Sequence, residues 1–201
     1  VDGQIPLNKD KEALAAFLAE NVQPNTKQFD SLAAKLDYLV ANDYYESAFL
    51  DKYSAAFKDD LYQYLQDQHF QFKSFMAAYK YYAQYALKTN DGEQYLEDFK
   101  DRVFANALYF ADGNESLAHD LAEEMIHQRY QPATPSFLNA GRSRRGELVS
   151  CFLLQVTDDM NSIGRAINSA LELSRIGGGV GLTLSNLREA GAPIKGIEGA
   201  A

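Results

Sequence analysis

The chain of 201 residues carries a formal net charge of −9, is 46% hydrophobic and 12% aromatic, and contains one cysteine. This composition is typical of a packed globular protein, and the negative charge argues against nonspecific binding to nucleic acid or to anionic membranes. No apolar run reaches the roughly 18 residues that span a bilayer, no signal peptide opens the chain, and a single cysteine forms no internal disulfide, so we expect a cytoplasmic protein.

The composition changes near Tyr130. All 13 tyrosines lie in residues 1–130, whereas of the 13 glycines only Gly3, Gly92 and Gly113 do. A tyrosine-rich, glycine-poor segment is typical of helices, and a glycine-rich one is typical of turns, strands and ligand loops. We therefore predict a helical domain over residues 1–130 and a second region over residues 131–201.

Helical spacing of apolar residues recurs through the first region, as in residues 11–22, where Leu14, Phe17 and Leu18 share one face. Residues 74–89 continue this spacing, and residues 74–87 within them are apolar nearly all round, which predicts a central helix. Asn114 or Ser116 is expected to cap the last helix, and the tyrosines are expected to serve mainly in packing. The further predicted helices cover residues 29–43, 57–68, 95–112 and 114–130.

The second region has a different pattern. Residues 147–156 form a short apolar run typical of a buried strand, and residues 158–176 have helical spacing with Asp158 or Asp159 as the N-cap. Residues 177–187 contain a glycine turn and a second apolar run. This order predicts a βαβ unit, for which a right-handed crossover is the default.

Two loops allow both a structural and a functional interpretation. Gly177 to Gly181 has no lysine after it, so it is no P-loop; it is either a helix C-cap with a tight turn or a backbone that a ligand approaches closely. The arginines in residues 142–147 form either a solvated turn or a phosphate-attracting loop.

Three further features bear on ligands. Asp158 is either a cap or an acceptor for a ribose hydroxyl, with Arg188 and Lys195 close enough in sequence to meet phosphate. The three histidines are far apart and match no metal-binding spacing. We therefore predict no metal site.

Several segments together resemble a known family. They are "TPSFLNAG", "SCFLL", "GGGVG" and "SNLREAGAPIKG", in this order and spacing. They strongly resemble the large catalytic subunit of class I ribonucleotide reductase, most closely the class Ib type, and the helical front, including "LDYLV", is similar as well. The resemblance implies a mainly α N-terminal domain, with a short or truncated ATP-cone region at its start. The first βαβ part of a ten-stranded α/β barrel would follow.

The resemblance also implies roles for individual residues. Cys151 matches the redox-active cysteine of the first barrel strand, whose partner cysteine would lie outside this chain. The substrate-binding residues would be Thr134, Ser150, Gly178 and Gly179. The effector-binding residues would be Asp158, Arg188, Ile194 and Lys195.

As a member of this family, the parent protein would reduce ribonucleoside diphosphates, under control by dNTP or ATP effectors. Its dimetal-tyrosyl radical would reside in a separate small subunit, and a thioredoxin- or glutaredoxin-like protein would re-reduce it. It would form a homodimer through residues 159–175. The radical-forming cysteine would lie beyond residue 201, so we expect a portion of a longer protein that is inactive alone. The alternative is a helical module that only binds nucleotide or a partner.

Overall fold

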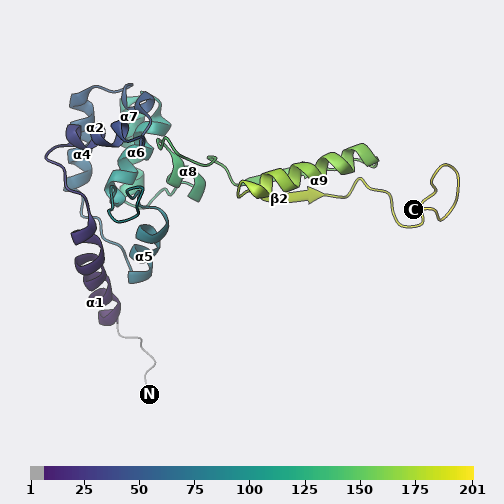
Figure 1. Cartoon of the computed structure of the whole chain (residues 1–201), viewed down its shortest axis with the longest axis horizontal. Coiled ribbons are helices and arrows are strands. Elements are labelled where there is room, and N and C mark those ends of the chain that lie inside the picture. Colours follow the sequence, from purple (N-terminus) through teal and green to yellow (C-terminus); the bar gives the residue numbers. More distant parts are fainter. Residues whose placement is uncertain (1–6) are drawn as a thin grey trace, which may run out of the picture. The chain divides into compact units, whose positions relative to one another are not determined.

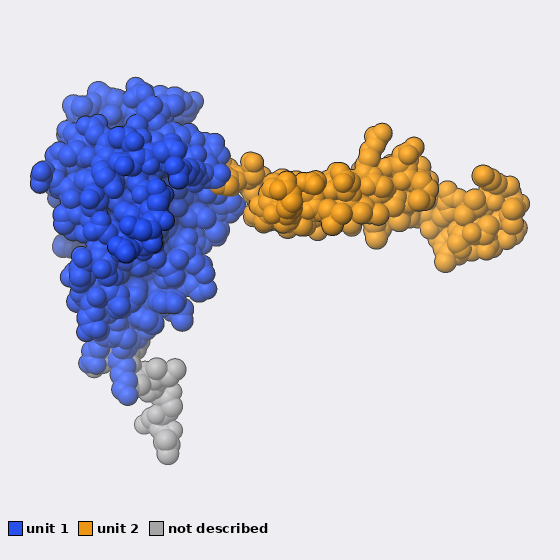
Figure 2. Space-filling model, in the orientation of Figure 1, with its two compact units in different colours: residues 1–145 blue, residues 146–201 orange. Residues whose placement is uncertain are grey.

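The computed structural model describes residues 7–201 (Figure 1). Two compact units divide the chain between Arg145 and Gly146, and Figure 2 colours them separately. We call them the helical unit and the strand unit. The change in composition at Tyr130 falls earlier than this division, because Phe137 is buried in the core of the helical unit.

The helical unit begins with α1 (Leu7–Phe17), which continues into a π-helical turn, η1 (Leu18–Val22), and a 3-10 turn, η2 (Gln23–Asn25). The helices that follow are α2 (Leu32–Ala41), α3 (Ser47–Leu50), α4 (Ala55–Asp67), α5 (Phe75–Gln84), α6 (Phe99–Ala111), α7 (Glu115–Ile126) and α8 (Thr134–Asn139).

Polar side chains cap the N-termini of most of the longer helices. The hydroxyls of Ser31, Ser54 and Ser74 accept hydrogen bonds from the amides three residues later, in α2, α4 and α5. Asn114 does the same for Leu117 and caps α7, so Asn114 rather than Ser116 is the cap. A capping box between Asp98 and Asp101 begins α6.

The central helix of the unit is α6. It packs against α3, α4 and α7, and ten of its 13 residues are buried. The expectation that residues 74–87 form the central helix was wrong. In α5 only Ala78, Tyr81 and Tyr82 are buried, whereas Met76 and Tyr79 are 56% and 47% exposed.

Most tyrosines pack against other rings, as the sequence predicts. Tyr81, for example, contacts Tyr82 and Phe99 edge-on, with ring centroids 5.1 and 5.5 Å away. Edge-on and offset ring pairs are favourable beyond the area that they bury. The aromatic side chains of α4, α5 and α6 therefore form a continuous part of the core.

The strand unit is the predicted βαβ arrangement: β1 (Cys151–Gln155), α9 (Met160–Arg175) and β2 (Gly179–Thr183). The two strands are parallel and pair in register from Cys151–Gly179 to Gln155–Thr183. Figure 1 shows α9 running along β2. The N-cap of α9 is Asp159, whose carboxylate accepts from the amide of Ser162.

The prediction that residues 147–156 form a buried strand is wrong for this chain. Burial alternates along β1: Phe152 and Leu154 are half-buried, while Cys151, Leu153 and Gln155 are exposed. Leu153 is 86% exposed. A two-stranded sheet with a single helix has one covered face, so the other face, which carries the thiol, is open.

Candidate functional site

Cys151 and three neighbours come together where both strands of the strand unit begin. The Cys151 side chain is a free, exposed thiol, and its residue pairs with Gly179 across the sheet. The amide of Gly179 donates to the carbonyl of Ser150 over 2.6 Å, and the Ser150 Oγ lies 3.9 Å from the Cys151 Sγ. The strand pairing thus places Ser150, Cys151, Gly178 and Gly179 at one end of the sheet.

Gly178 is required by packing. A Cβ at this position would lie 2.6 Å from a ring carbon of Phe152 and 2.9 Å from the carbonyl oxygen of Leu173. Both distances are below normal van der Waals contact, and a backbone carbonyl cannot move aside easily. Gly179 is more open, with a Cβ position 3.5 Å from the Ser150 carbonyl. The glycines therefore let the chain that follows α9 pack closely against Phe152 of β1. They also leave backbone without side chains beside the thiol.

Gly178→Ala is therefore expected to lower the free energy of unfolding of the strand unit by about 1–3 kcal/mol, the usual cost of overpacking. Amide hydrogen exchange of residues 151–155 and 179–183 would measure this as faster exchange. Gly164→Ala is the matched control, because a Cβ there meets nothing within 4 Å and alanine favours a helix interior. Equal exchange in Gly178→Ala and the unsubstituted protein would contradict the steric argument.

At the other end of the sheet, Asp158 and Arg188 meet. The Arg188 Nε donates to the Asp158 Oδ2 over 2.7 Å, and both side chains are between one third and two fifths exposed. Because a guanidinium has five N–H donors, this bond leaves capacity for a further anion. Beside α9 lies a cavity of about 500 Å³, whose polar lining includes Thr157, Ser162 and Arg165.

Ile194 and Lys195 lie in a tight turn of their own. The backbones of Ile194 and Ile197 exchange two hydrogen bonds of 3.0 and 3.1 Å, and both central residues, Lys195 and Gly196, have positive φ. This pattern is that of a type I′ turn. Among the hydrogen bonds and ion pairs of the described residues, none joins this turn to Asp158 or Arg188.

Thr134 lies in the helical unit, as the first residue of α8, and its side chain is exposed. The Thr134 Oγ1 is 2.9 Å from the hydroxyl of Tyr85. Thr134 thus belongs to the helical unit, whereas the residues around Cys151 belong to the strand unit.

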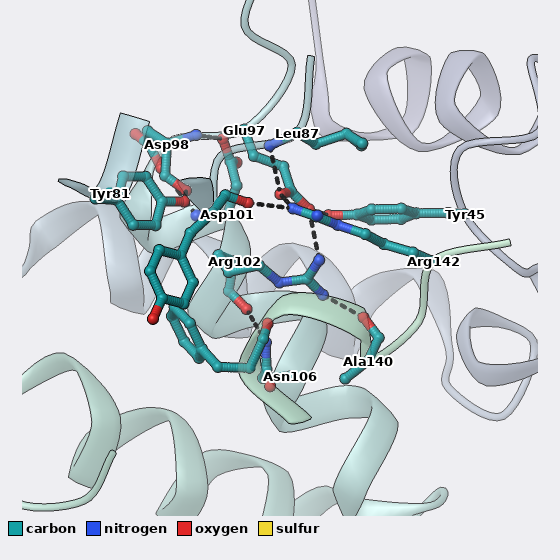
Figure 3. Close-up of polar contacts among 12 residues, drawn as sticks. Tyr45, Tyr81, Leu87, Glu97, Asp98, Asp101, Arg102, Asn106, Ala140 and Arg142 are labelled. Carbon is teal, nitrogen blue, oxygen red and sulfur yellow. Dashed lines mark hydrogen bonds and ion pairs between the residues drawn. The ribbon is translucent and has the colours of Figure 1, made fainter. Parts of the chain in front are cut away.

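A buried polar cluster, which the sequence did not reveal, holds the end of α8. We call Tyr45, Glu97, Arg102 and Arg142 the Glu97 cluster (Figure 3). Arg102 Nη1 lies 3.0 Å from one carboxylate oxygen of Glu97, and Arg142 Nη2 lies 2.6 Å from the other. The Tyr45 hydroxyl donates to the same carboxylate, as does the amide of Leu87 over 3.1 Å.

The cluster holds Glu97 strongly in its ionised form. Burial by itself would raise the pKa of the Glu97 carboxyl, but Arg102, Arg142 and the hydrogen bond from Tyr45 outweigh it and lower the pKa to about 2. Burial likewise opposes the charge of Arg142, yet the facing carboxylate raises its pKa. The ion pairs are therefore fully formed at neutral pH.

The same arginines fix the chain around α8. Arg102 Nη2 donates to the carbonyl of Ala140, and Arg142 Nη2 donates to the carbonyl of Tyr85. Asn106, one turn along α6, donates to the carbonyl of Phe137 over 3.0 Å. Side chains thus tie residues 137–142 to α6 and to the end of α5, and an antiparallel backbone bridge pairs Arg142 with Tyr45.

The solvated turn covers only part of the basic loop in residues 142–147, because residues 144–147 are exposed and Arg142 is not. Arg142 is buried in the Glu97 cluster and so is not part of a solvated turn. Arg144 pairs with Asp43 and Arg145 with Glu46, each over 3.2 Å. All three arginines have carboxylate partners within the helical unit.

Residues 7–201 contain no group of three or more His, Cys, Asp or Glu side chains arranged to hold a metal ion. Within the same residues, no helix combines the length and the apolar character that a membrane crossing requires.

Comparison with protein families gives three consecutive matches. Residues 1–70 match the ribonucleotide reductase N-terminal model, residues 71–145 the ribonucleotide reductase all-alpha domain and residues 149–201 the ribonucleotide reductase barrel domain. The last boundary coincides closely with the division between the two units.

Curated relatives agree with these matches. The chain is 49% identical over 199 residues to the ribonucleoside-diphosphate reductase subunit alpha of Bacillus subtilis (strain 168), covering 99% of the chain and 28% of the relative. It is 50% identical over 199 residues to the nrdEB subunit alpha of Bacillus phage SPbeta, covering 99% of the chain and 18% of the relative. It is 50% identical over 189 residues to the subunit alpha of Mycoplasma genitalium (strain ATCC 33530 / DSM 19775 / NCTC 10195 / G37), covering 94% of the chain and 26% of the relative.

The chain thus spans between 18% and 28% of the length of these relatives. The matches fit a part of a large subunit rather than a helical module that only binds nucleotide or a partner.

Proposed function

Because the chain belongs to the ribonucleotide reductase family, we propose that it forms the N-terminal part of a class Ib ribonucleoside-diphosphate reductase large subunit. The full-length subunit reduces ribonucleoside diphosphates to deoxyribonucleoside diphosphates. The observation that carries the proposal is the pairing of Cys151 with Gly179, which presents an exposed thiol beside bare glycine backbone. Backbone without side chains beside the thiol lets a substrate approach it closely.

In the proposed reaction Cys151 acts with a second cysteine from a part of the subunit beyond residue 201. Two thiols become one disulfide and supply two electrons and two protons. The ribose 2′-hydroxyl leaves as water, and a C–H bond replaces the C–O bond. The second sulfur must approach until the two Cα atoms are roughly 4.4–6.8 Å apart, and the open face of β1 gives it access.

The substrate would bind through Thr134, Ser150, Gly178 and Gly179. The two glycines expose backbone that a side chain would otherwise cover, so the substrate can lie against it. Ser150 adds a hydroxyl next to the thiol. Thr134 supplies a second hydroxyl from the helical unit, for the diphosphate or the ribose.

The specificity effector, a dNTP or ATP, would bind at the far end of the sheet. Asp158 would accept a ribose hydroxyl and Arg188 would contact phosphate, while Ile194 and Lys195 would belong to the loop that links effector and substrate sites. The Asp158–Arg188 ion pair supports this role, because it holds an acceptor and a cation side by side.

The partners follow from the same proposal. The exposed apolar residues of α9, such as Ile167 and Leu171, support a homodimer through this helix. A separate small subunit would supply the dimetal-tyrosyl radical, and a thioredoxin- or glutaredoxin-like protein in the cytoplasm would reduce the disulfide.

The double variant Asp158→Ala/Arg188→Ala tests the proposal in the full-length large subunit, assayed with its small subunit and a dithiol reductant. We expect the unsubstituted enzyme to form deoxyribonucleoside diphosphates and to change its preferred substrate with the effector. The double variant should bind effector at least about tenfold more weakly, since it loses charge-assisted hydrogen bonds. It should also lose the effector-dependent change in preference.

Arg129→Ala is the matched control, because this exposed arginine also pairs with carboxylates, those of Glu123 and Glu124, but in the helical unit. Absence of deoxyribonucleotide product in the unsubstituted enzyme would contradict the proposed reaction. Unchanged effector affinity in the double variant would contradict the effector site.

A further inference from the structure

Tyr85 contacts the segment that carries Thr134 at three points. Its hydroxyl lies 2.9 Å from the Thr134 Oγ1, its ring centroid lies 6.0 Å from that of Phe137, and its carbonyl accepts from Arg142. A single residue at the end of α5 thus touches the start, the middle and the far side of the segment from Thr134 to Arg142.

The hydroxyl of Tyr85 is held in place by rigid surroundings. The amide of Tyr85 donates to the carbonyl of Tyr81 over 2.8 Å, and the two rings are almost parallel, 5° apart, with centroids separated by 6.4 Å. Arg142, which holds the carbonyl of Tyr85, is itself fixed by its 2.6 Å ion pair with Glu97. The aromatic core and the Glu97 cluster therefore both set the position of this hydroxyl.

The direction of the hydrogen bond matters for an anionic ligand. A threonine hydroxyl has one proton to donate and two lone pairs that accept. If Tyr85 donates to Thr134, the threonine proton is free for an outside acceptor, and the side chain is exposed. Phosphate oxygens are acceptors, so binding selects this direction, and a chain of hydrogen bonds polarises each member.

We propose that Tyr85 is a positioning residue for substrate, whose hydroxyl donates to the Thr134 Oγ1 and so directs the threonine proton to the substrate. The inference rests on the proposed function, in which Thr134 binds the diphosphate or the ribose of a ribonucleoside diphosphate. Tyr85 itself does not touch the substrate. It determines which way a substrate-binding hydroxyl points.

The test uses Tyr85→Phe in the full-length large subunit, which keeps the ring contacts and the carbonyl contact and removes one oxygen. We expect KM for a ribonucleoside diphosphate to rise about 3- to 10-fold, the range for loss of one neutral hydrogen bond. The turnover number and the affinity for the effector should stay within roughly twofold, because the hydroxyl acts on substrate binding. Tyr62→Phe is the control, since it removes the same atom from a tyrosine whose hydroxyl donates to Asp101 in the same unit.

Thr134→Val separates this inference from the proposed function. It should raise KM at least as much as Tyr85→Phe, and the double variant should resemble Thr134→Val alone, because the tyrosine acts only through the threonine. A raised KM in Thr134→Val with an unchanged KM in Tyr85→Phe overturns the positioning role alone. An unchanged KM in Thr134→Val overturns the role of Thr134 and the inference together. The inference also fails if Tyr85→Phe changes the turnover number as much as it changes KM. It fails likewise if Tyr62→Phe raises KM as much as Tyr85→Phe does.

Discussion

Cys151→Ser in the full-length large subunit should abolish repeated turnover while leaving effector binding nearly intact. Serine has almost the size of cysteine and fits the exposed start of β1. Its oxygen, however, cannot form the disulfide that delivers the electron pair to the nucleotide. Product formation with a dithiol reductant should therefore fall to the background of the assay.

The effector site supplies an internal control for this variant. β1 has five residues between the thiol end and the Asp158 end, about 17 Å at 3.3 Å per residue. An uncharged substitution at one end should not change nucleotide affinity at the other. Effector affinity within roughly twofold of the unsubstituted protein would show that the fold is intact. Unchanged turnover would refute the redox role of Cys151.

Alkylation provides a second measurement on the unsubstituted subunit. After reaction with substrate and small subunit, but without external reductant, Cys151 should be protected from a thiol reagent, because it lies in a disulfide. Treatment with a reductant should restore labelling. Equal labelling before and after the reaction would also refute the redox role. Cys151 is the only cysteine in residues 1–201, so its peptide can be identified without ambiguity by mass spectrometry.

Local patterns predict much of this fold. Apolar spacing places the longer helices within a few residues of their observed bounds, and the strand–helix–strand order predicts the βαβ unit, although the register of Cys151 with Gly179 comes from the structure alone. The same patterns misplace the central helix. α5 and α6 each carry four aromatic residues, yet α6 is more buried, because burial is decided by the number of elements packed around a helix. Residues within one segment cannot reveal how many neighbours it has.

The Glu97 cluster illustrates the other limit. Glu97 and Arg102 lie in a charged stretch that looks like the exposed end of a helix, and Arg142 lies in a loop with two further arginines. Tyr45, Glu97 and Arg142 are brought together only by the packing of three connections, those before α3, before α6 and after α8. The spacing of charges predicts neighbours within a helix, but not ion pairs between residues 45 positions apart.

Removal of the Glu97 charge should strongly destabilise the helical unit. In Glu97→Gln two buried guanidiniums lose their shared counter-charge, and the Nε atoms of Arg102 and Arg142 already have no hydrogen-bond partner. Breaking a buried ion pair on one side typically costs about 3–5 kcal/mol. Glu93→Gln, the same substitution at an exposed site, should change stability by less than about 0.5 kcal/mol. All 13 tyrosines lie in residues 1–130 and the chain has no tryptophan, so the tyrosine band of the near-ultraviolet circular dichroism spectrum reports unfolding of the helical unit.

The difference in the free energy of unfolding between Glu97→Gln and the unsubstituted chain should become smaller as the pH falls. The pKa of Glu97 is lowered from 4.5 to about 2 in the folded state. The ionised carboxylate therefore stabilises the fold fully above pH 4.5, and this contribution is lost as the pH falls towards 2. At 1.36 kcal/mol per pKa unit, the loss is about 3 kcal/mol. The gap between the two proteins should thus be constant from pH 8 to pH 5 and should narrow below pH 4.5. A gap that stays constant down to pH 2 would show that the carboxylate is not held ionised by Arg102 and Arg142.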